Sequence, residues 1–316
     1  MTEQGSDQSP EAPAPEAAEP ATPEASIHPF PAGASDDSSS SNEATDVSRE
    51  TSATEEQRTR IIAIANQKGG VGKTTTAINL ATALAAAERT VLVIDLDPQG
   101  NASTGLGIGR EQRGHSTYDI LVGSALLADS VVASNVPRLS VVPASVDLAA
   151  AELELIDLDN REFRLRDMLA KSPIAYDYVL IDCPPALGLL TLNALVAADS
   201  ILVPLQCEFF ALEGLSHLLK TVERVRKRLN PKLEIQGIVL TMFDARNKLS
   251  ELVAADVRGF IPDKVYHTVI PRNVRVSEAP SHGKPVLLYD WRCTGSQAYI
   301  HLAREILRRE EGEKAA

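Results

Sequence analysis

Residues that mark several classes of protein are scarce in this chain. Its 316 residues include three cysteines, one tryptophan and 4% aromatic residues. Because Cys183, Cys207 and Cys293 are odd in number and widely spaced, they match no zinc or disulfide pattern and suit a reducing cytosol. No uncharged run reaches the roughly 18 apolar residues of a membrane helix. No basic start followed by an apolar stretch is present either. We therefore expect neither a membrane span nor a secretory signal.

Negative charge is in excess, but it is unevenly distributed. The chain has 43 acidic and 31 basic residues, a formal net charge of −12. That total alone argues against a nucleic-acid-binding protein, because Lys and Arg bind phosphate backbones. However, residues 1–57 hold 13 acidic residues and a single basic one, Arg49. The rest of the chain has equal numbers of acidic and basic side chains and is electrically neutral.

Residues 1–57 also lack the apolar side chains that a folded core requires. They contain seven of the 19 prolines, are rich in Ser, Ala and Glu, and have four large apolar residues, which are Met1, Ile27, Phe30 and Val47. Such a segment cannot bury enough surface to offset its loss of conformational entropy. We expect an acidic, disordered tail that keeps the protein soluble. The alternative is a short docking motif around Phe30 or around residues 47–51.

From residue 58 onward, short β-rich apolar runs alternate with segments of helical length. Several runs are apolar at almost every position, as strands covered on both faces are. The alternation predicts one α/β domain over residues 58–316, with a doubly wound, mostly parallel sheet. The expected strands lie at 61–65, 91–94, 139–142, 178–181, 201–203, 235–240 and 265–270, and the clearest helices at 74–87, 212–229 and 296–309.

A glycine-rich segment joins the first expected strand to the first helix. Glycines there let backbone N–H groups turn toward phosphate oxygens, and the following helix offers its positive N-terminal end. Lys73 is placed to reach the β- and γ-phosphates of a nucleotide, and the Thr74 hydroxyl to bind Mg²⁺. The common motif has glycine at position 67, where this chain has Gln67, and it lacks the extra charge of Lys68. The backbone of Lys68 already faces phosphate, so its side chain has few local roles, and we expect it to reach the nucleotide of a second subunit.

Three aspartates follow apolar strands and are expected at the same edge of the sheet. Asp95 and Asp97 end the second strand, and Asp182 ends the strand at 178–181. Ligands of open α/β sheets bind at the carboxyl ends of the strands. A buried carboxylate there needs a partner, and a metal–phosphate group is one. Spacing alone does not choose between Asp95 and Asp97.

These segments resemble the ParA/MinD ATPases. Residues 68–75 resemble their deviant Walker A motif, and residues 93–103 and 178–185 continue the resemblance. Residues 240–246 and 270–285 are similar to the ParA/Soj chromosome-partitioning branch in particular. Together the matching stretches span nearly all of residues 60–309.

The resemblance implies a P-loop NTPase fold and a slow, switch-type ATPase that uses Mg²⁺. The implied catalytic residues are Lys68, Lys73 and Asp97, with Asp97 positioning the attacking water, and the implied metal site consists of Thr74, Asp97 and Asp182. The implied nucleotide-binding residues are Lys68, Gly69, Gly70, Val71, Gly72, Lys73, Thr74 and Thr75, with Met242, Pro271 and Asn273 near the adenine.

The resemblance also implies partners. An ATP-bound homodimer would bind DNA without sequence preference, and a ParB-type protein would stimulate the hydrolysis that releases it. Arg246 and Arg275 match the positions that carry DNA binding in Soj-type proteins. The expected location is the cytoplasm, on the nucleoid, and the expected cargo is a chromosome or a plasmid.

Three other classes of protein have the same glycine-rich phosphate-binding loop and are alternatives to a partitioning ATPase. A MinD-like, membrane-associated ATPase that positions cell division would end in a basic amphipathic helix. Here Leu302, Ile306 and Leu307 are expected to pack in the core, and an acidic, polar stretch follows them. An iron–sulfur reductase would need a different cysteine spacing from that of Cys183 and Cys207. An ATP-dependent metabolic ligase would need a small-substrate pocket, which the sequence does not reveal.

Overall fold

The structure is a computed structural model that describes residues 58–172 and 175–315. The predicted disordered tail, residues 1–57, lies outside the described residues, as does the docking motif considered around Phe30 or residues 47–51.

Within these residues one eight-stranded sheet forms, in the order β3-β4-β2-β5-β1-β6-β7-β8. Every neighbouring pair is parallel except β3 with β4, so the predicted doubly wound, mostly parallel α/β fold is confirmed. The strands are β1 (Arg60–Ile64), β2 (Val91–Asp95), β3 (Val132–Ala133), β4 (Leu139–Val142), β5 (Tyr178–Asp182), β6 (Ser200–Gln206), β7 (Glu234–Phe243) and β8 (Val265–Pro271).

The central strands are buried on both faces, which explains their continuous apolar sequences. All five residues of β2 and all five of β5 are buried. The two strands pair in parallel, with Asp95 beside Asp182 at their carboxyl ends. On the other side of β5, Asp182 lies beside Ile64 of β1, the strand that leads into the glycine-rich loop. The register therefore brings the loop and two of the three aspartates to one edge.

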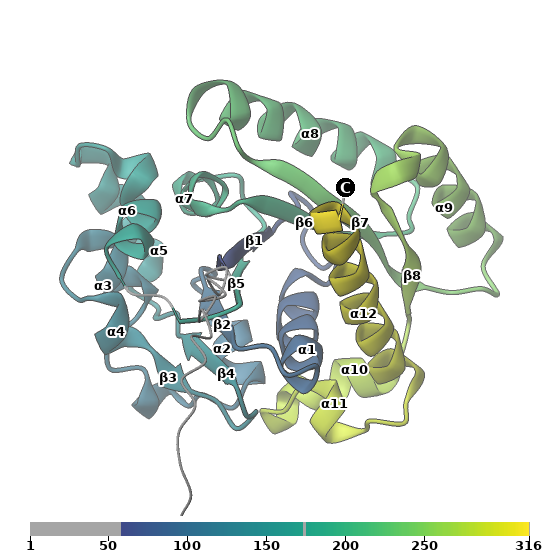
Figure 1. Ribbon diagram of the computed structural model, residues 1–316, viewed down its shortest axis with the longest axis horizontal. Coiled ribbons are helices and arrows are strands. Elements are labelled where there is room, and N and C mark those ends of the chain that lie inside the picture. Colours follow the sequence, from purple (N-terminus) through teal and green to yellow (C-terminus); the bar gives the residue numbers. More distant parts are fainter. Residues whose placement is uncertain (1–57, 173–174, 316) are drawn as a thin grey trace, which may run out of the picture. The chain divides into compact units, whose positions relative to one another are not determined.

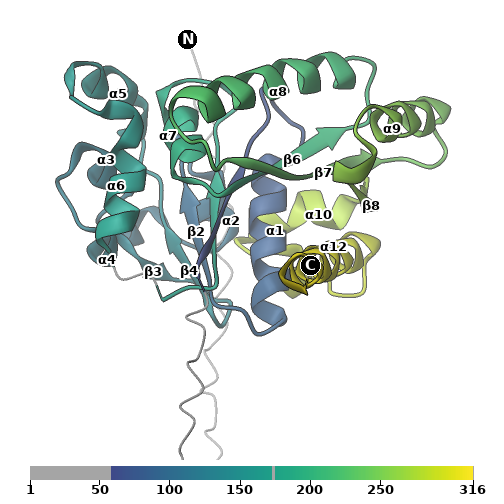
Figure 2. The same ribbon diagram turned by 45° about the horizontal axis from the view of Figure 1, so that its top comes forward.

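Helices cover both faces of the sheet (Figures 1 and 2). Residues of α3 to α9 share one hydrophobic core cluster, and residues of α1, α2, α11 and α12 share the other. In Figure 2, α8 runs on one side of β6 and β7, and α1, α10 and α12 lie on the other. The helices are α1 (Lys73–Ala86), α2 (Asn101–Gly105), α3 (Thr117–Val122), α4 (Leu127–Ser130), α5 (Leu148–Glu154), α6 (Arg164–Lys171), α7 (Leu189–Ala197), α8 (Ala211–Arg228), α9 (Lys248–Phe260), α10 (Val274–Glu278), α11 (Val286–Tyr289) and α12 (Thr294–Ala315).

Helix α12 packs along α1 and β8 (Figure 1). Leu302 and Ile306 are fully buried, and Leu307 packs against the same core cluster. The predicted core role of this stripe is confirmed, because these side chains face protein and are not available to a lipid surface. Among the described residues, no helix has both the length and the apolarity to cross a bilayer.

The apolar contacts of α12 generate a stability prediction. Replacing Ile306 with Ala leaves a cavity between α12 and the sheet and should lower the free energy of unfolding by about 2–5 kcal/mol. Urea denaturation of the purified protein measures this change. The matched control is Arg308→Ala on the exposed side of the same helix, which should change stability by less than about 0.5 kcal/mol. Equal losses in both variants would contradict the assigned packing.

Candidate functional site

The loop between β1 and α1 is held open by backbone geometry and by contacts from distant strands. Gly70 and Gly72 have φ angles of 75° and 88°, in the left-handed region that a side chain disfavours. Thr241 Oγ1 donates a hydrogen bond to the Val71 carbonyl oxygen at 2.8 Å. Asn66 Nδ2 donates to the Pro204 carbonyl oxygen at 2.7 Å, and Asn66 Oδ1 accepts from a loop N–H. Strands β6 and β7 therefore fix the loop from one side.

The N-terminus of α1 opens directly from this loop. Its N-cap is Gly72, which has no side chain to bond the first N–H groups of the helix. These unpaired donors, together with the helix dipole, favour an anion. A Cβ built on Gly69 or Gly70 would meet no atom within 4 Å, so the space in front of the loop is open. The geometry is that of a phosphate-binding loop.

Lys73 supplies the positive charge of the site. Its side chain is largely buried, and Nζ donates to the Lys68 carbonyl oxygen at 3.1 Å. Burial lowers the pKa of Lys73, and the negative charge of Asp182 opposes that shift. The ammonium group is thus positioned across the mouth of the loop, next to the strand-end carboxylates.

Asp95 has a structural task that its sequence position did not reveal. Its Oδ2 accepts hydrogen bonds from Ser103 N at 2.8 Å and from Ser103 Oγ at 2.6 Å. Its Oδ1 accepts from Asp97 N at 3.3 Å. Burial raises the pKa of Asp95 to about 6 despite these bonds. Asp95 therefore ties β2 to helix α2, and both of its oxygens are occupied by protein donors.

Asp97 lies just beyond the strand and is less constrained. Its Oδ1 accepts a hydrogen bond from Gln99 N at 3.0 Å, the one hydrogen bond to this carboxylate found among the described residues. Asp97 is 8% exposed, whereas Asp95 is fully buried. The two aspartates that the sequence could not separate therefore differ, and Asp97 is the one with a free oxygen at the site.

Among the described residues, Asp182 is the carboxylate of the site that most clearly lacks a hydrogen-bonding partner. Both carboxylate oxygens are buried and neither has a hydrogen bond of ordinary geometry, although the Thr74 hydroxyl faces the group closely enough to lower its pKa. Burial and, next, the negative charge of Asp95 raise the pKa of Asp182 well above its usual value. An ionised carboxylate in such a place requires a cation.

Lys73, Asp182, Asp97 and Thr74 fit a hydrated magnesium–phosphate group. Mg²⁺ is usually held by one or two carboxylates, with phosphate and water completing its shell. Within the described residues, no group of three or more His, Cys, Asp or Glu side chains could hold a metal ion by itself. A site that depends on phosphate oxygens for its remaining ligands agrees with both observations.

Lys68, for which the sequence suggested few local roles, has a partner within its own chain. Its Nζ forms an ion pair with Glu208, which follows β6. Both side chains are about two-fifths exposed. Phe209 and Phe210, next to Glu208, are exposed and pack edge to face. The reach of Lys68 to a second subunit stays a prediction.

A cavity of about 160 Å³ adjoins the loop. Gly72 and Thr75 form the side nearest the phosphate-binding loop. The volume is below the ~300 Å³ of a complete small-molecule site, so it suits one planar ring of a larger ligand. The other lining residues are Thr241, Met242, Ile270, Pro271, Arg272, Asn273, Val276, Ser277, Pro280 and Tyr299.

The cavity brings together the three residues expected near the adenine, which are Met242, Pro271 and Asn273. Met242 has a φ of 50°, an uncommon left-handed conformation for a residue other than glycine. Asn273 Oδ1 accepts hydrogen bonds from Arg275 N and Val276 N, and so caps helix α10. Its side chain therefore shapes the wall of the cavity rather than pointing a free amide at a ligand.

Of the two arginines expected to bind DNA, Arg246 lies in the loop that follows β7, and Arg275 lies in α10, which begins after the short loop that follows β8. Arg246 is 90% exposed and donates two hydrogen bonds of 2.9 Å to Asp244. Arg275 pairs with Glu278 at 3.0 Å and with Asp290 at 3.7 Å. The loops are joined, because Arg272 N donates to the Phe243 carbonyl oxygen. Both arginines are thus at one end of the sheet, and each is partly neutralised.

Several residues of the site escaped sequence reasoning because their partners are remote. Tyr299 reaches the cavity from α12, and its hydroxyl lies 3.4 Å from Thr76 Oγ1, 223 positions away. Thr241 and Glu208 also contact the loop across long separations. Ser103 carried one signal, since it follows Asp95 by eight residues at the start of a helix.

Comparison with known sequences identifies close relatives. The sequence model of an AAA domain matches residues 59–235. The chromosome partitioning protein ParA of Caulobacter vibrioides is 64% identical over 260 residues, which cover 81% of this chain and 97% of that protein. The sporulation initiation inhibitor protein Soj of Bacillus subtilis is 55% identical over 247 residues, or 78% of this chain and 98% of that protein.

Among solved structures, the chain is similar to cobyrinic acid a,c-diamide synthase from Mycobacterium smegmatis with a bound ATP analog and magnesium. The TM-score is 0.69 and the identity 36%, over 80% of this chain and 96% of the synthase. The partitioning proteins share far more sequence with this chain than the synthase does.

The buried carboxylates predict how stability depends on pH. The pKa of Asp182 is raised, so the folded protein binds its proton more tightly than the unfolded chain does, and stability due to this group falls as pH rises above about 4. Asp182→Asn should therefore unfold at a higher temperature than the wild type at pH 7, and the difference should vanish near pH 4. Differential scanning calorimetry without ligand measures it.

Asp244 provides the opposite case as a control. Its hydrogen bonds with Arg246 lower the pKa of Asp244 to about 2, so its contribution is present at neutral pH and is lost as pH falls through about 4 to 2. Asp244→Asn should not raise the melting temperature at pH 7. A stabilised Asp244→Asn, or an Asp182→Asn protein that melts below the wild type at pH 7, would be inconsistent with these assignments.

Proposed function

The chain belongs to the ParA/Soj family of chromosome-partitioning ATPases, and from that premise we propose that residues 58–316 act as an ATP-dependent switch on DNA. The observation that carries the proposal is the pairing of an open phosphate-binding loop with a buried carboxylate, Asp182, that lacks a partner. The switch would separate chromosomes or plasmids by holding DNA in one nucleotide state and releasing it in the other.

ATP is the proposed substrate and Mg²⁺ the proposed cofactor. The loop N–H groups and Lys73 would bind the phosphates, the cavity at Met242 and Pro271 would take the adenine, and Thr74 and Asp182 would hold the metal. When bound, Mg²⁺ neutralises phosphate charge and orients the triphosphate. The similarity to a synthase with a bound ATP analog and magnesium supports this choice of ligands.

Asp97 is the proposed residue that positions the attacking water. A water-orienting group needs a carboxylate oxygen that is not already occupied by the protein, and Asp97 has one whereas Asp95 does not. Asp97 can also contribute to the metal site through water, because it lies near Asp182 and Lys73. Catalysis here depends on position and charge, which is the general pattern for phosphoryl transfer.

Dimerisation would complete the site. We assign to Lys68 the role of reaching the nucleotide of a second subunit, where its charge would offset the charge that develops on the phosphates. Within its own chain Lys68 pairs with Glu208. To reach the second subunit, Lys68 would have to exchange the Glu208 carboxylate for a nucleotide phosphate. Because both groups are partly exposed, this ion pair is worth little and its exchange costs little.

DNA binding would follow from the dimer. Arg246 and Arg275 each neutralise few phosphates alone, and two subunits joined across ATP would double the number on one rigid body. The contacts would be to phosphate and without base preference. A ParB-type partner would stimulate hydrolysis, and the protein would work in the cytoplasm on the nucleoid.

A MinD-like membrane ATPase is the second candidate, and the position of α12 disfavours it. Leu302 and Ile306 would have to leave the core to bind lipid. The high identity to partitioning proteins supports the DNA switch instead.

The first functional prediction separates hydrolysis from binding. Asp97→Ala should keep ATP binding and dimerisation and lower turnover by roughly 10²–10⁴-fold, the usual worth of a positioned acid or base. Lys73→Ala should lose nucleotide binding, and Lys68→Ala should lose dimerisation and hydrolysis. Phosphate release, nucleotide titration and light scattering measure the three properties. Wild-type turnover in Asp97→Ala would exclude its assigned role.

The second functional prediction concerns DNA. The wild type should bind DNA with ATP and not without it, and its log affinity should fall with log salt by about 0.9 per phosphate neutralised. Arg246→Ala combined with Arg275→Ala should abolish this binding and leave the ATP dimer intact. Electrophoretic mobility shifts at several salt concentrations measure both. Binding that ignores nucleotide and substitution alike would refute the switch.

A further inference from the structure

The segment that carries Asp97 turns sharply between β2 and α2. Gly100 N donates a hydrogen bond to the Asp97 carbonyl oxygen at 2.8 Å, and Gln99 N donates to Asp97 Oδ1 at 3.0 Å. Gly100 is the N-cap of α2 and has a φ of 63°. Because the turn closes on itself through these bonds, a group that fixes Gly100 also fixes where the Asp97 carboxylate lies.

The side chain of Arg113 holds this turn against its surroundings. Within the described residues, the hydrogen-bond acceptors of its guanidinium are all neutral. They are Thr104 Oγ1 at 2.8 Å and the carbonyl oxygens of Ile108 at 3.1 Å, Ala144 at 3.2 Å and Gly100 at 3.4 Å. These groups belong to α2, to the segments on either side of it and to the loop after β4. A planar guanidinium can bind several such acceptors at once, whereas an ammonium group acts as a point charge.

The guanidinium also packs on the face of Gly100. A Cβ built on Gly100 would overlap Arg113 Nη1. The positive φ of Gly100 already disfavours a side chain at this position. Glycine is thus required here for two reasons, once by the conformation of the backbone and once because Arg113 covers the turn.

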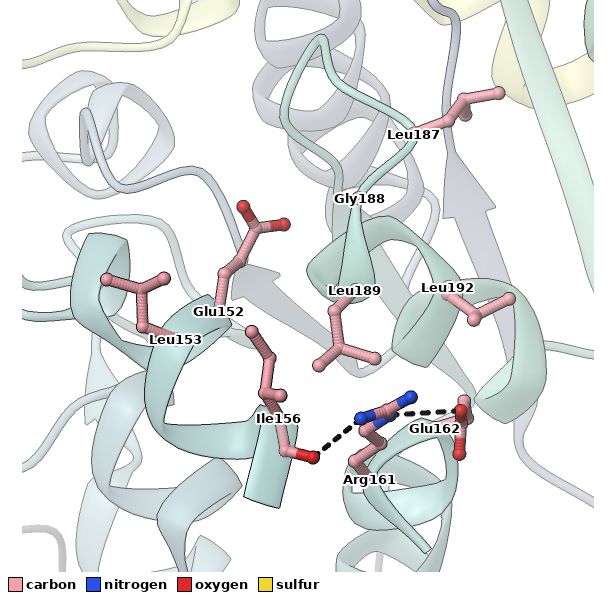
Figure 3. Close-up of a pocket in the computed structure, with 9 residues that line it drawn as sticks. All are labelled: Glu152, Leu153, Ile156, Arg161, Glu162, Leu187, Gly188, Leu189 and Leu192. Atoms are coloured by element: carbon pink, nitrogen blue, oxygen red, sulfur yellow. Dashed lines mark hydrogen bonds and ion pairs between the residues drawn. The ribbon is translucent and has the colours of Figure 1, made fainter. Parts of the chain in front are cut away.

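The loop at Ala144 is the fixed support of this arrangement. Ala144 N donates a hydrogen bond to Ser103 Oγ at 3.1 Å, and Ser103 is the residue that binds Asp95. Beyond Ala144 the chain leads to α5, where Glu152 accepts a hydrogen bond from Leu190 N of α7 at 3.4 Å. Figure 3 shows Glu152 on the α5 side of the hollow between these two helices. The loop is therefore anchored both at the point that the guanidinium binds and further along the chain.

Arg113 also interacts with the charge of the site. Burial lowers the pKa of Arg113, and the negative charge of Asp95 opposes that shift. Lys73 interacts in the same way with Asp182, from the side of the phosphate-binding loop. The guanidinium is therefore a second cation beside the strand-end carboxyl groups, and it lies on the side of α2.

We propose that Arg113 is a positioning residue for ATP hydrolysis, because it holds the turn from Asp97 to Gly100 against the Ala144 loop and so keeps the free carboxylate oxygen of Asp97 where the attacking water stands. Arg113 acts through the backbone of the turn. A displacement of about 1 Å at a reacting group can cost a factor of about 100 in rate. The effect on hydrolysis rests on the proposed function of Asp97, whereas the rigidity of the turn does not.

Steady-state kinetics of the full chain test the effect on hydrolysis. Arg113→Gln should lower kcat by roughly 10–100-fold and leave the KM for ATP within about twofold, because the phosphate-binding loop is untouched. Arg113→Lys keeps the charge but not the planar set of donors, so it should recover only part of kcat. In an Asp97→Ala background, Arg113→Gln should cause no further loss. The matched control is Arg110→Gln, which removes an exposed arginine three residues away and should turn over as the wild type does.

Amide hydrogen exchange without nucleotide tests the turn itself. Peptides that cover residues 97–105 should exchange about tenfold faster in Arg113→Gln than in the wild type or Arg110→Gln, while peptides of α8 keep their protection. Faster exchange throughout the protein, or a KM that rises as kcat falls, would show a merely structural role and overturn the proposal. Wild-type kcat or unchanged exchange in Arg113→Gln would overturn it as well. A wild type without any ATPase, or an Asp97→Ala protein with wild-type turnover, would reject the proposed function, and the exchange result would still decide whether Arg113 holds the turn.

Discussion

The burial of closely spaced carboxyl groups at one edge of the sheet is the constraint on which the rest of the site depends. The parallel register brings Asp95 beside Asp182, and the chain places Asp97 two residues beyond. The cation near these carboxyl groups is Lys73, and burial lowers the pKa of its ammonium group. Close, buried carboxyl groups of this kind cost folding free energy, and a divalent ion with phosphate would offset that cost. The fold therefore gives up some stability at this edge of the sheet in favour of ligand binding, as buried functional sites often do.

Sequence reasoning succeeded where local pattern and burial coincide. The central strands β2, β5 and β6 are buried along almost their whole length, so their apolar runs are continuous, whereas β3 has two residues at an edge and leaves no such pattern. The helices between α1 and β5 have four to eight residues each, too few to show a helical period. The phosphate-binding loop was legible because its glycines and Lys73 are adjacent in the chain. The different tasks of Asp95 and Asp97 were not, because they depend on where Ser103 folds back.

Charge pairing on the surface would keep the proposed binding of DNA to this electrically neutral part of the chain weak. Arg246 is paired with Asp244 of its own loop and Arg275 with Glu278 of its own helix, so a phosphate would have to compete with an existing ion pair. Exposed pairs of this kind are nearly balanced, which lets a modest change in geometry or valency decide the outcome. The same balance applies to Lys68 and Glu208.

The hydrogen-bonding contact between Thr76 and Tyr299 joins segments that are 223 positions apart, and it has a consequence for how the protein is made. Synthesis proceeds from the N-terminus, so the phosphate-binding loop leaves the ribosome long before Tyr299 and the other remote residues that line the adjoining cavity. A growing chain holds half of a nucleotide site for most of its synthesis. Nucleotide recognition thus becomes a property of the finished polypeptide, and an interrupted chain that lacks α12 is incomplete at its centre as well as at its end.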